Sequence, residues 1–268
     1  MLKKITAFIA IIALLCFSGC SSPEEIFSIT VLKIGKADAI ILNTDSGAVL
    51  IDTGEEDDGA EILEKSKARG IEKFDYMILT HYDKDHVGGA AEVINGMEIG
   101  QIIEPGYEKD SGAYNAFEFA AGKKGITRTV PEENMSFELD GVTYEIYIPK
   151  KDSYSNENDN SLVIKVTWNS ISSLFTGDAL DERVNEILKE DISAAILKVP
   201  HHGSYESTSK ALFEKVGAKY AVITCSDKNP AEDETLQALS ECGTKTLLTA
   251  NGDVEIVIRQ DRNISIVQ

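Results

Sequence analysis

The sequence predicts an α/β protein in which two mixed β-sheets face each other and helices cover their outer sides. Short β-rich runs alternate with helical periodicity in both halves of the chain. Hydrophobic residues make up 43% of the 268 residues, enough to bury a full core within one domain. The counts of 20 Gly and 6 Pro are too low for a collagen-like or disordered chain. Since each half mixes strands and helices, two sheets packed face to face are the simplest arrangement.

The first half of the chain opens with three predicted strands. The β-rich runs at 27–33, 39–43 and 48–52 are separated by Gly or polar turns. A helix is expected at 59–68, because Ile62 and Leu63 form an apolar side there and a Gly follows its end. The same criteria predict strands at 74–80 and 99–103 and helices at 87–95 and 114–123.

The second half continues the pattern after a predicted hairpin. Residues 137–148 form that hairpin, with its turn at Asp140-Gly141. Apolar runs and helical periodicity then predict strands at 161–168, 172–176, 194–199, 220–224, 246–249 and 254–258, and helices at 181–189, 209–216 and 232–242.

The N-terminal residues form a predicted export signal and not part of the fold. Lys3 and Lys4 precede an apolar run over 5–17, which is shorter than a membrane-spanning helix requires. The small residues before Cys20 resemble a bacterial lipoprotein cleavage site. We therefore expect a lipoprotein signal peptide at 1–19, a lipid anchor on Cys20 and a tether at 20–26. The alternative is an ordinary secretory signal cleaved nearby, and both interpretations place the protein outside the cytoplasm.

The charge balance limits the possible partners. The chain has 26 basic and 45 acidic residues, a formal net charge of −19. Such a surface repels polyphosphates, which disfavours a nucleic-acid binder that uses a broad basic groove. The pairs Lys123-Lys124 and Lys150-Lys151 are either local basic patches or ordinary solvated turns.

Two cysteines, Cys225 and Cys242, lie beyond the predicted signal region. Export would permit a disulfide between them, and two buried free thiols are the alternative. Neither stands in a Cys-x-x-Cys spacing, so the sequence predicts no metal-binding role for them.

The densest cluster of metal-ligating residue types is His81-Tyr82-Asp83-Lys84-Asp85-His86. It lies on the loop between a predicted strand and a predicted helix. Imidazole and carboxylate groups at alternating positions can converge on one point, as a metal site requires. The Gly88-Gly89 pair that follows lets the backbone pass close to another segment. The pattern favours a metal site over a solvated loop with capping aspartates, and Tyr82 and Lys84 would then point away, to the core or the rim.

This stretch resembles the His-x-His-x-Asp-His hallmark of the metallo-β-lactamase superfamily of hydrolases, with Asp83 in place of the second His. The His-x-Asp-x-Asp-His form is similar to the C-terminal hydrolase domain of competence-type DNA-uptake channel proteins. Five further segments carry the resemblance, in family order: Ile34-Gly35-Lys36-Ala37-Asp38-Ala39-Ile40, Leu50-Ile51-Asp52-Thr53-Gly54, Asn160-Ser161-Leu162-Val163, Phe175-Thr176-Gly177-Asp178-Ala179 and Leu197-Lys198-Val199-Pro200-His201-His202-Gly203-Ser204.

The resemblance implies a four-layer αββα sandwich over residues 27–268, with two mixed sheets inside and helices outside. It also implies hydrolysis by two divalent metal ions and the hydroxide that bridges them. The membrane-spanning portion of the channel proteins has no counterpart in this sequence. Only the hydrolase activity is therefore carried over, and not DNA transport.

By the same resemblance, six side chains are expected to bind metal: His81, Asp83, Asp85, His86, Asp178 and His202. The first two would hold one ion, and Asp178 would bridge both ions. Asp85, His86 and one of the paired histidines would hold the other ion, with His202 favoured. Asp85 and His201 are the candidate catalytic residues, and His201 would face the leaving group or a phosphate if His202 is the ligand.

The histidine count limits the kind of metal site. All four histidines of the chain lie in the two His-containing motifs, so a five-His dinuclear zinc site cannot be built. The remaining ligands must be mainly carboxylates. An oxygen-rich set shifts the preference toward Mn²⁺ or Mg²⁺, although Zn²⁺ also binds well. The expected cofactors are two divalent ions, Zn²⁺ or Mn²⁺.

Four further residues are candidates for supporting the site or binding substrate. The resemblance implies that Asp52 orients a ligand histidine by hydrogen bonding, and a turn-capping role is the alternative. Asp38 has the same two interpretations. Asn160 would donate to a substrate oxygen or cap a strand. Ser204 would present a hydroxyl or backbone N–H to an anion, or act as a helix cap.

Together these observations predict a membrane-anchored metal-dependent hydrolase outside the cytoplasm. The resemblance favours a phosphodiester substrate, either DNA, a nucleotide or a wall polymer. An acyl or lactone hydrolase of the same fold and a non-catalytic surface binding lipoprotein are the alternatives. Apart from the membrane, no protein partner is expected.

Overall fold

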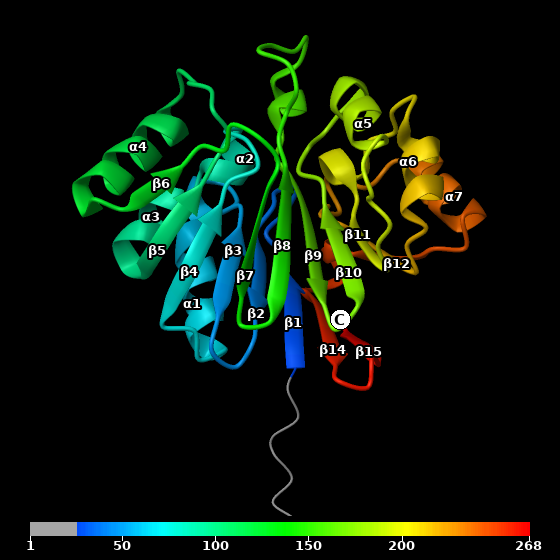
Figure 1. Ribbon diagram of the computed structural model, residues 1–268, viewed down its shortest axis with the longest axis horizontal. Helices are drawn as coiled ribbons and strands as arrows, with labels where there is room; N and C mark the ends of the chain where they lie inside the picture. Colours follow the sequence, from blue (N-terminus) through cyan, green and yellow to red (C-terminus); the bar gives the residue numbers. More distant parts are fainter. Residues whose placement is uncertain (1–25) are drawn as a thin grey trace, which may run out of the picture.

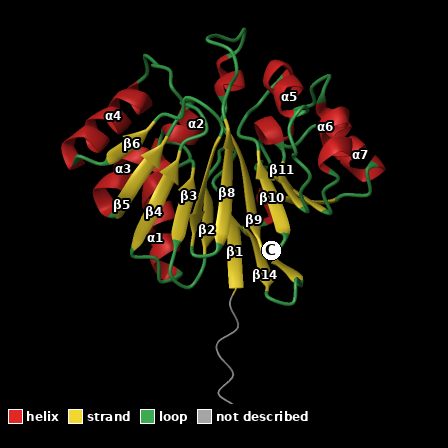
Figure 2. Ribbon diagram, in the orientation of Figure 1, coloured by secondary structure: helices red, strands yellow, loops and turns green. Residues whose placement is uncertain are grey.

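In the computed structural model, which describes residues 26–268, two β-sheets face each other and helices cover both outer sides (Figures 1 and 2). The fold is the four-layer α/β sandwich that the sequence predicts. Within residues 26–268, no helix is both long and apolar enough to cross a membrane. The expected signal peptide and the Cys20 anchor lie outside the described residues, as does the tether up to residue 25.

One sheet has eight strands in the order β15-β14-β1-β2-β3-β4-β5-β6. The strands are β1 (Ile26–Val31), β2 (Ile40–Asn43), β3 (Ala48–Ile51), β4 (Lys73–Ile78), β5 (Glu98–Ile103), β6 (Thr127–Thr129), β14 (Val254–Arg259) and β15 (Ile264–Val267). The pairs from β3 to β6 are parallel and the others antiparallel, so the sheet is mixed.

The other sheet has seven strands in the order β13-β12-β11-β10-β9-β8-β7. The strands are β7 (Met135–Leu139), β8 (Val142–Tyr147), β9 (Val163–Trp168), β10 (Ile171–Phe175), β11 (Ile196–Lys198), β12 (Tyr220–Ile223) and β13 (Lys245–Leu248). Pairs from β10 to β13 are parallel and those from β7 to β10 antiparallel.

Helices form the two outer layers. The helices are α1 (Gly59–Ala68), α2 (Lys84–Val87), α3 (Ala90–Gly96), α4 (Gly112–Lys124), α5 (Asp181–Ile187), α6 (Ser209–Val216) and α7 (Asp233–Glu241). Short 3-10 turns are η1 (Glu56–Asp58), η2 (Glu157–Asn160), η3 (Pro200–Gly203) and η4 (Thr249–Asn251). Helices α1 to α4 cover the eight-stranded sheet, and α5 to α7 cover the seven-stranded sheet (Figure 2).

The core consists of three apolar layers, because successive side chains of a strand point to opposite faces. In β3, Val49 and Ile51 enter the layer between the sheets, whereas Ala48 and Leu50 enter the layer beneath the helices. A third layer lies between the seven-stranded sheet and α5 to α7. Burial on both faces explains the continuous apolar runs in these strands.

The structure corrects the prediction of one helix over 87–95. The helical residues form two pieces, α2 and α3, with Gly88 and Gly89 between them. A Cβ on Gly88 would lie 2.6 Å from the carbonyl carbon of Glu55, so the chain passes too close to the segment after β3 for a side chain. The sequence also failed to predict β6 and β15. Both are short strands at the edges of the eight-stranded sheet and carry few buried side chains.

Candidate metal centre

The polar motifs converge on the rim where four strands end. Strands β3 and β4 run parallel in one sheet, and β10 and β11 run parallel in the other. The loops after these strands carry the predicted ligand motifs, and Figure 1 shows these loops on the same side of the molecule. Segments far apart in the sequence thus meet, because the two sheets face each other and their parallel strands end at one rim.

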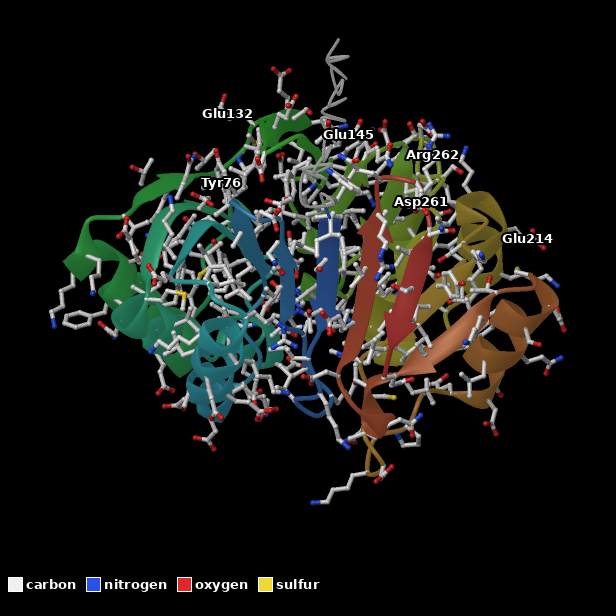
Figure 3. The ribbon with its side chains drawn as sticks, turned by 90° about the horizontal axis from the view of Figure 1, so that it is seen from below. Tyr76, Glu132, Glu145, Glu214, Asp261 and Arg262 are labelled. Carbon is white, nitrogen blue, oxygen red and sulfur yellow. The ribbon has the colours of Figure 1, made fainter. Side chains whose placement is uncertain are left out.

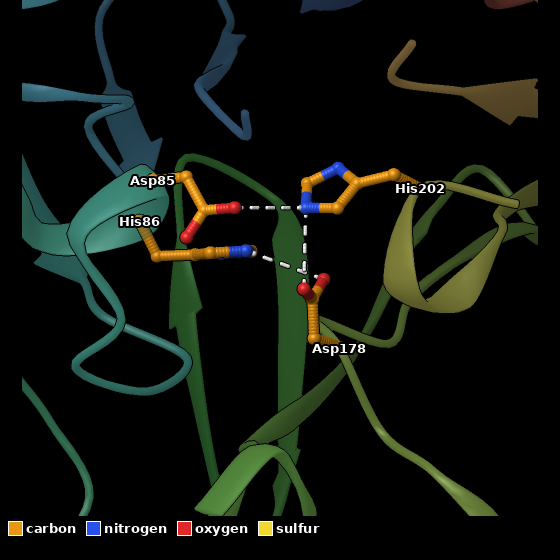
Figure 4. Close-up of side chains that lie close together, drawn as sticks. All are labelled: Asp85, His86, Asp178 and His202. Carbon is orange, nitrogen blue, oxygen red and sulfur yellow. Dashed lines mark ion pairs between the residues drawn. The ribbon is translucent and has the colours of Figure 1, made fainter. Parts of the chain in front are cut away.

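Four side chains form one compact group, Asp85, His86, Asp178 and His202 (Figure 4). One ligand atom from each lies within 4.8 Å of all the others. The Nε2 atom of His86 is 3.2 Å from Asp178 Oδ1, and that of His202 is 3.2 Å from Asp178 Oδ2 and 3.4 Å from Asp85 Oδ2. Two imidazoles and two carboxylates facing one point form a suitable ligand set for a divalent ion.

Several residues of this rim have left-handed backbone conformations. Seven non-glycine residues in the described chain have positive φ, and four of them lie in the turns of β-hairpins. The other three are Asp52, His201 and His202, with φ of 57°, 47° and 54°. Non-glycine residues are uncommon in this region of backbone space and cluster where the surrounding structure constrains them. Asp52 follows β3, and His201 and His202 follow β11, so all three lie in the loops at this rim.

Asp52 orients His86. Its Oδ2 lies 2.8 Å from His86 Nδ1, and its two oxygens accept hydrogen bonds of 2.7 Å from the N–H and the hydroxyl of Thr80. A carboxylate that only accepts requires the proton of His86 on Nδ1, which leaves Nε2 as the free ligand atom. Since Thr80 donates its hydroxyl proton to Asp52, its oxygen accepts from His81 Nδ1 at 3.1 Å. Nε2 is therefore also the free atom of His81.

Asp38 orients His202 through a threonine. The hydroxyl of Thr224 donates to Asp38 Oδ1 at 2.6 Å, and its oxygen lies 2.9 Å from His202 Nδ1. Because the hydroxyl has one proton and donates it to Asp38, Nδ1 of His202 must be the donor in the second bond. Nε2 of His202 therefore also faces the centre and, once deprotonated, offers its lone pair to a cation.

Sequence reasoning missed Lys198, the buried cation of this network. Its side chain is 1% exposed, and Nζ pairs with Asp38, donates to the carbonyl of Gly177 at 3.0 Å and lies 3.5 Å from Asp178 Oδ1. The available signal was a lysine that ends the otherwise apolar run Ile196-Leu197 before Val199. A lysine in such a run is buried only when it is paired.

The buried polar atoms of the site fit a bound cation. The buried Nε2 atoms of His81, His86 and His202 and Oδ1 of Asp178 make no hydrogen bond of good geometry. Buried polar atoms without partners are uncommon in native proteins, because each one loses its hydration. A divalent ion would satisfy the atoms gathered in the four-residue group.

The charges of the group perturb its titration. Burial alone would lower the pKa of His86, but Asp178, Asp52 and Asp38 outweigh burial and raise this pKa well above its usual value. The pKa of His202 is also raised, since Asp178 and Asp85 outweigh its burial. Burial raises the pKa of Asp178, yet the nearby histidines and Lys198 together hold it well below its ordinary value. Without a metal, protons on the imidazoles balance the carboxylates.

Residues 33–226 match the family model described as the metallo-beta-lactamase superfamily. The chain belongs to this superfamily. It is 26% identical over 267 residues to ComE operon protein 3 of Bacillus subtilis, covering 90% of this chain and 34% of that protein. It is 28% identical over 223 residues to Recombination protein 2 of Haemophilus influenzae, covering 81% of this chain and 26% of that protein. The chain thus spans about a third or less of these relatives' length.

A solved structure has the same fold. The metallo-beta-lactamase fold protein YhfI from Bacillus subtilis superposes with a TM-score of 0.58 at 13% identity, covering 88% of this chain and 99% of that one. The resemblance to the superfamily and to competence proteins, inferred from the motifs, is therefore confirmed, and so is the fold class.

Two predicted ligands of this superfamily member lie outside the four-residue group. The Nε2 atom of His81 is 3.9 Å from Asp83 Oδ2. The other oxygen of Asp83 is engaged by the ammonium of Lys109. His201, the candidate catalytic residue, is partly buried, and its Nδ1 has no hydrogen-bond partner. Burial lowers the pKa of His201 below its usual value, which favours a neutral imidazole at the rim.

The remaining predicted residues make mainly local contacts. The amide of Asn160 donates to the carbonyl of Glu157 at 2.9 Å within η2, and the N–H of Ser204 donates to the carbonyl of His201 at 3.0 Å. Tyr82 is buried and donates to Glu104, while Lys84 is an exposed rim residue, as the alternation in the motif predicts.

The structure also shows the partners of the Lys150-Lys151 pair and the state of the two cysteines. Lys150 and Lys151 form ion pairs with Glu190 and Glu182, respectively, so this pair is not an uncompensated basic patch. Cys225 and Cys242 are free thiols, so the alternative without a disulfide applies, although only Cys225 is fully buried.

Proposed function

We propose that the chain is a divalent-metal-dependent phosphodiesterase that acts outside the cytoplasm on DNA, a nucleotide or a wall polymer. The observation that carries this proposal is the convergence of Asp85, His86, Asp178 and His202 on one point, with the ring nitrogens oriented for a cation. Membership of a superfamily of mostly metal-dependent hydrolases and kinship with competence proteins support it.

The residues of the chain have distinct roles in this proposal. A divalent ion bound at the four-residue group would supply an activated water and stabilise negative charge on a phosphoryl oxygen. Asp52 and Asp38 hold the ligand histidines in the tautomer that leaves Nε2 free. His201, with an unpaired ring nitrogen at the rim, is placed to contact a phosphate oxygen or the leaving group.

The net charge bears on the choice among phosphodiesters. At −19, the whole molecule repels a polyanion, whereas a small diester carries only about one charge and is repelled less. Compared with a set of imidazoles alone, a ligand set that includes carboxylates shifts the preference toward Mn²⁺ or Mg²⁺. A second ion, which the resemblance implies, would depend on His81 and Asp83.

Metal reconstitution and a substrate panel test the proposal. The full chain is stripped with chelator, reloaded with Mn²⁺ or Zn²⁺, and assayed on bis-p-nitrophenyl phosphate, single-stranded DNA and a lactone. We expect diester cleavage that Asp85→Asn and His202→Asn abolish. The exposed control Asp261→Asn, on the turn between β14 and β15, should cleave like the wild type.

Three outcomes would contradict it. Equal turnover by wild type and Asp85→Asn excludes catalysis at this centre. Cleavage of the lactone alone favours an acyl hydrolase. Metal binding without hydrolysis of any substrate favours a non-catalytic binding lipoprotein.

The lipid anchor on Cys20 is a second part of the proposal. Strand β1 starts at Ile26. Val31 at its other end pairs with Ile40 of β2, which pairs with Ile51 of β3, so the end of β1 at Val31, and not its start, is level with the rim of the metal centre. An anchor before β1 would therefore leave the centre facing away from the membrane (Figure 1). Labelling of cells with a radioactive fatty acid should mark the wild type and not Cys20→Ser. Equal labelling of both would contradict the anchor.

A further inference from the structure

The carboxylate of Asp83 already has a cationic partner. Asp83 lies on the loop between β4 and α2, and one of its oxygens pairs with Nζ of Lys109 from the loop between β5 and α4. Its other oxygen lies 3.9 Å from Nε2 of His81. The side chains of Asp83 and Lys109 are 32% and 20% exposed, so the pair is partly shielded from water.

A second carboxylate fixes the lysine in place. Nζ of Lys109 also donates to Oε2 of Glu157 in η2 at 2.7 Å. The same ammonium therefore joins the loop that carries Asp83 to a segment of the other half of the molecule. A cation with two carboxylate partners from different segments is more constrained than one in a single surface pair.

The ligands available to a second ion near Asp83 are few, mainly Asp83 itself and His81. Among residues 26–268, only two groups bring three or more metal-ligating side chains within reach of one point, and neither contains His81 or Asp83. The first is the four-residue group. The second, formed by Asp38, Asp52 and His86, is already satisfied by Lys198, Thr80 and Thr224.

We propose that the centre binds one divalent ion in the four-residue group and that the ammonium of Lys109, paired with Asp83, excludes a second ion. This inference rests on the metal binding proposed above. A second ion at Asp83 would have to break the Lys109 pair and remain beside its positive charge, with Nε2 of His81 3.9 Å from the other oxygen of Asp83. Lys109 is thus a specificity-determining residue for metal stoichiometry.

Metal counting on matched variants tests this proposal. Equilibrium dialysis of the full chain against Mn²⁺ gives the number of bound ions, and electron paramagnetic resonance distinguishes an isolated Mn²⁺ from an exchange-coupled pair. We expect one isolated ion in the wild type and in Lys109→Arg, which keeps the charge. Lys109→Met should bind a second, weaker ion and show the coupled signal.

Substitution of Asp83 provides the internal control. In the wild-type background, Asp83→Asn should leave one ion bound, with its Kd changed less than about threefold, since Asp83 is not a ligand of that ion. In the Lys109→Met background, it should remove the second ion. A tenfold loss of affinity for the first ion in Asp83→Asn would overturn the proposal.

The remaining outcomes separate this inference from the proposed function. Two ions in the wild type overturn the inference even if diesters are cleaved. One ion in Lys109→Met overturns the role of Lys109. One ion in the wild type without hydrolysis supports the inference and contradicts the phosphodiesterase, and no bound ion overturns both.

Discussion

Lys198 is a buried cation beside the candidate metal centre. It is fully buried, pairs with Asp38 and approaches Asp178, so three charges share a region with little water. Removing one partner of a buried pair costs more than the pair contributes, because the other charge is left uncompensated. The role of Lys198 is therefore testable as a stability effect in the metal-free protein.

We expect Lys198→Met to lower the free energy of unfolding of the chelator-treated protein by about 3–5 kcal/mol. Adding Asp38→Asn should recover part of this loss, because it removes the uncompensated carboxylate. Urea denaturation of the single and double variants measures both effects. The control Lys84→Met breaks only an exposed pair with Glu55 and should change stability by less than about 1 kcal/mol. Losses that simply add in the double variant would contradict the coupling.

The raised pKa values of His86 and His202 predict how pH acts on the metal-free protein. A folded pKa above the unfolded value of 6.5 means that the protonated histidines stabilise the fold fully below pH 6.5. This contribution is lost as the pH rises through the raised folded pKa. The melting temperature in chelator should therefore fall as the pH is raised above 6.5.

The stabilisation by bound metal should depend on pH in the opposite direction, because the ion binds imidazoles that have lost the proton on Nε2. We expect the rise in melting temperature on adding Mn²⁺ to be larger at alkaline than at acidic pH. Thermal melts with and without metal across this range measure both trends. A metal-induced rise that is largest at acidic pH would contradict the protonation states inferred here.

At the scale of elements, α2, which carries the candidate ligands Asp85 and His86, is held in place by hydrogen bonds of its backbone. The carbonyl of His86 accepts from the N–H and hydroxyl of Thr53 at 2.7 and 2.8 Å, and that of Asp85 accepts from the N–H of Asp38 at 3.0 Å. Gly88 continues this close contact between α2 and the segment after β3. The short helix and its candidate ligands are thus positioned by the loops that follow the strands.

Gly88→Ala should disturb this contact. Its Cβ would lie 2.6 Å from backbone atoms of Glu55 and Glu56, so we expect a loss of about 1–3 kcal/mol in stability. Because α2 carries two ligands, affinity for Mn²⁺ should also weaken. The control Gly122→Ala, in α4 with open space around the new Cβ, should stabilise the protein by up to about 1 kcal/mol. Denaturant titration and metal binding measure both, and unchanged affinity in Gly88→Ala would argue against this coupling.

At the scale of the whole molecule, the excess of acidic residues sets the long-range field. Figure 3 shows the molecule from below, with Glu132, Glu145, Glu214 and Asp261 among its labelled side chains. Beside them, Arg262 is the one labelled base. With a net charge of −19, a polyanionic substrate meets repulsion before it reaches the metal centre.

If the proposed phosphodiesterase accepts DNA, salt should therefore speed that reaction. Raising the ionic strength from about 20 to about 150 mM shortens the range of charge repulsion. We expect kcat/KM for single-stranded DNA to rise severalfold and that for bis-p-nitrophenyl phosphate to change little. Rate measurements over a salt series provide the check. A steep fall for DNA would indicate a local basic surface that captures the strand.

Much of the fold followed from local patterns. The helices at 59–68 and 209–216 have the predicted bounds, and the hairpin turns at Asp140-Gly141 as expected, because periodicity and turn chemistry are properties of neighbouring residues. The predicted single helix at 87–95 was wrong, and Gly88 at the break packs against Glu55, a contact with a residue far away in the sequence. Motif order identified the superfamily and the rim that carries the ligands.

The sequence by itself determined the candidate ligands, since all four histidines lie in two motifs. Only the tertiary structure decided that His202, and not His201, joins Asp85, His86 and Asp178. It also revealed that Lys198 forms a buried ion pair with Asp38 and that Lys109 forms an ion pair with Asp83. The physical reason is that a side chain's charge partner is set by which strands and loops meet in space, and spacing along one chain does not encode that meeting.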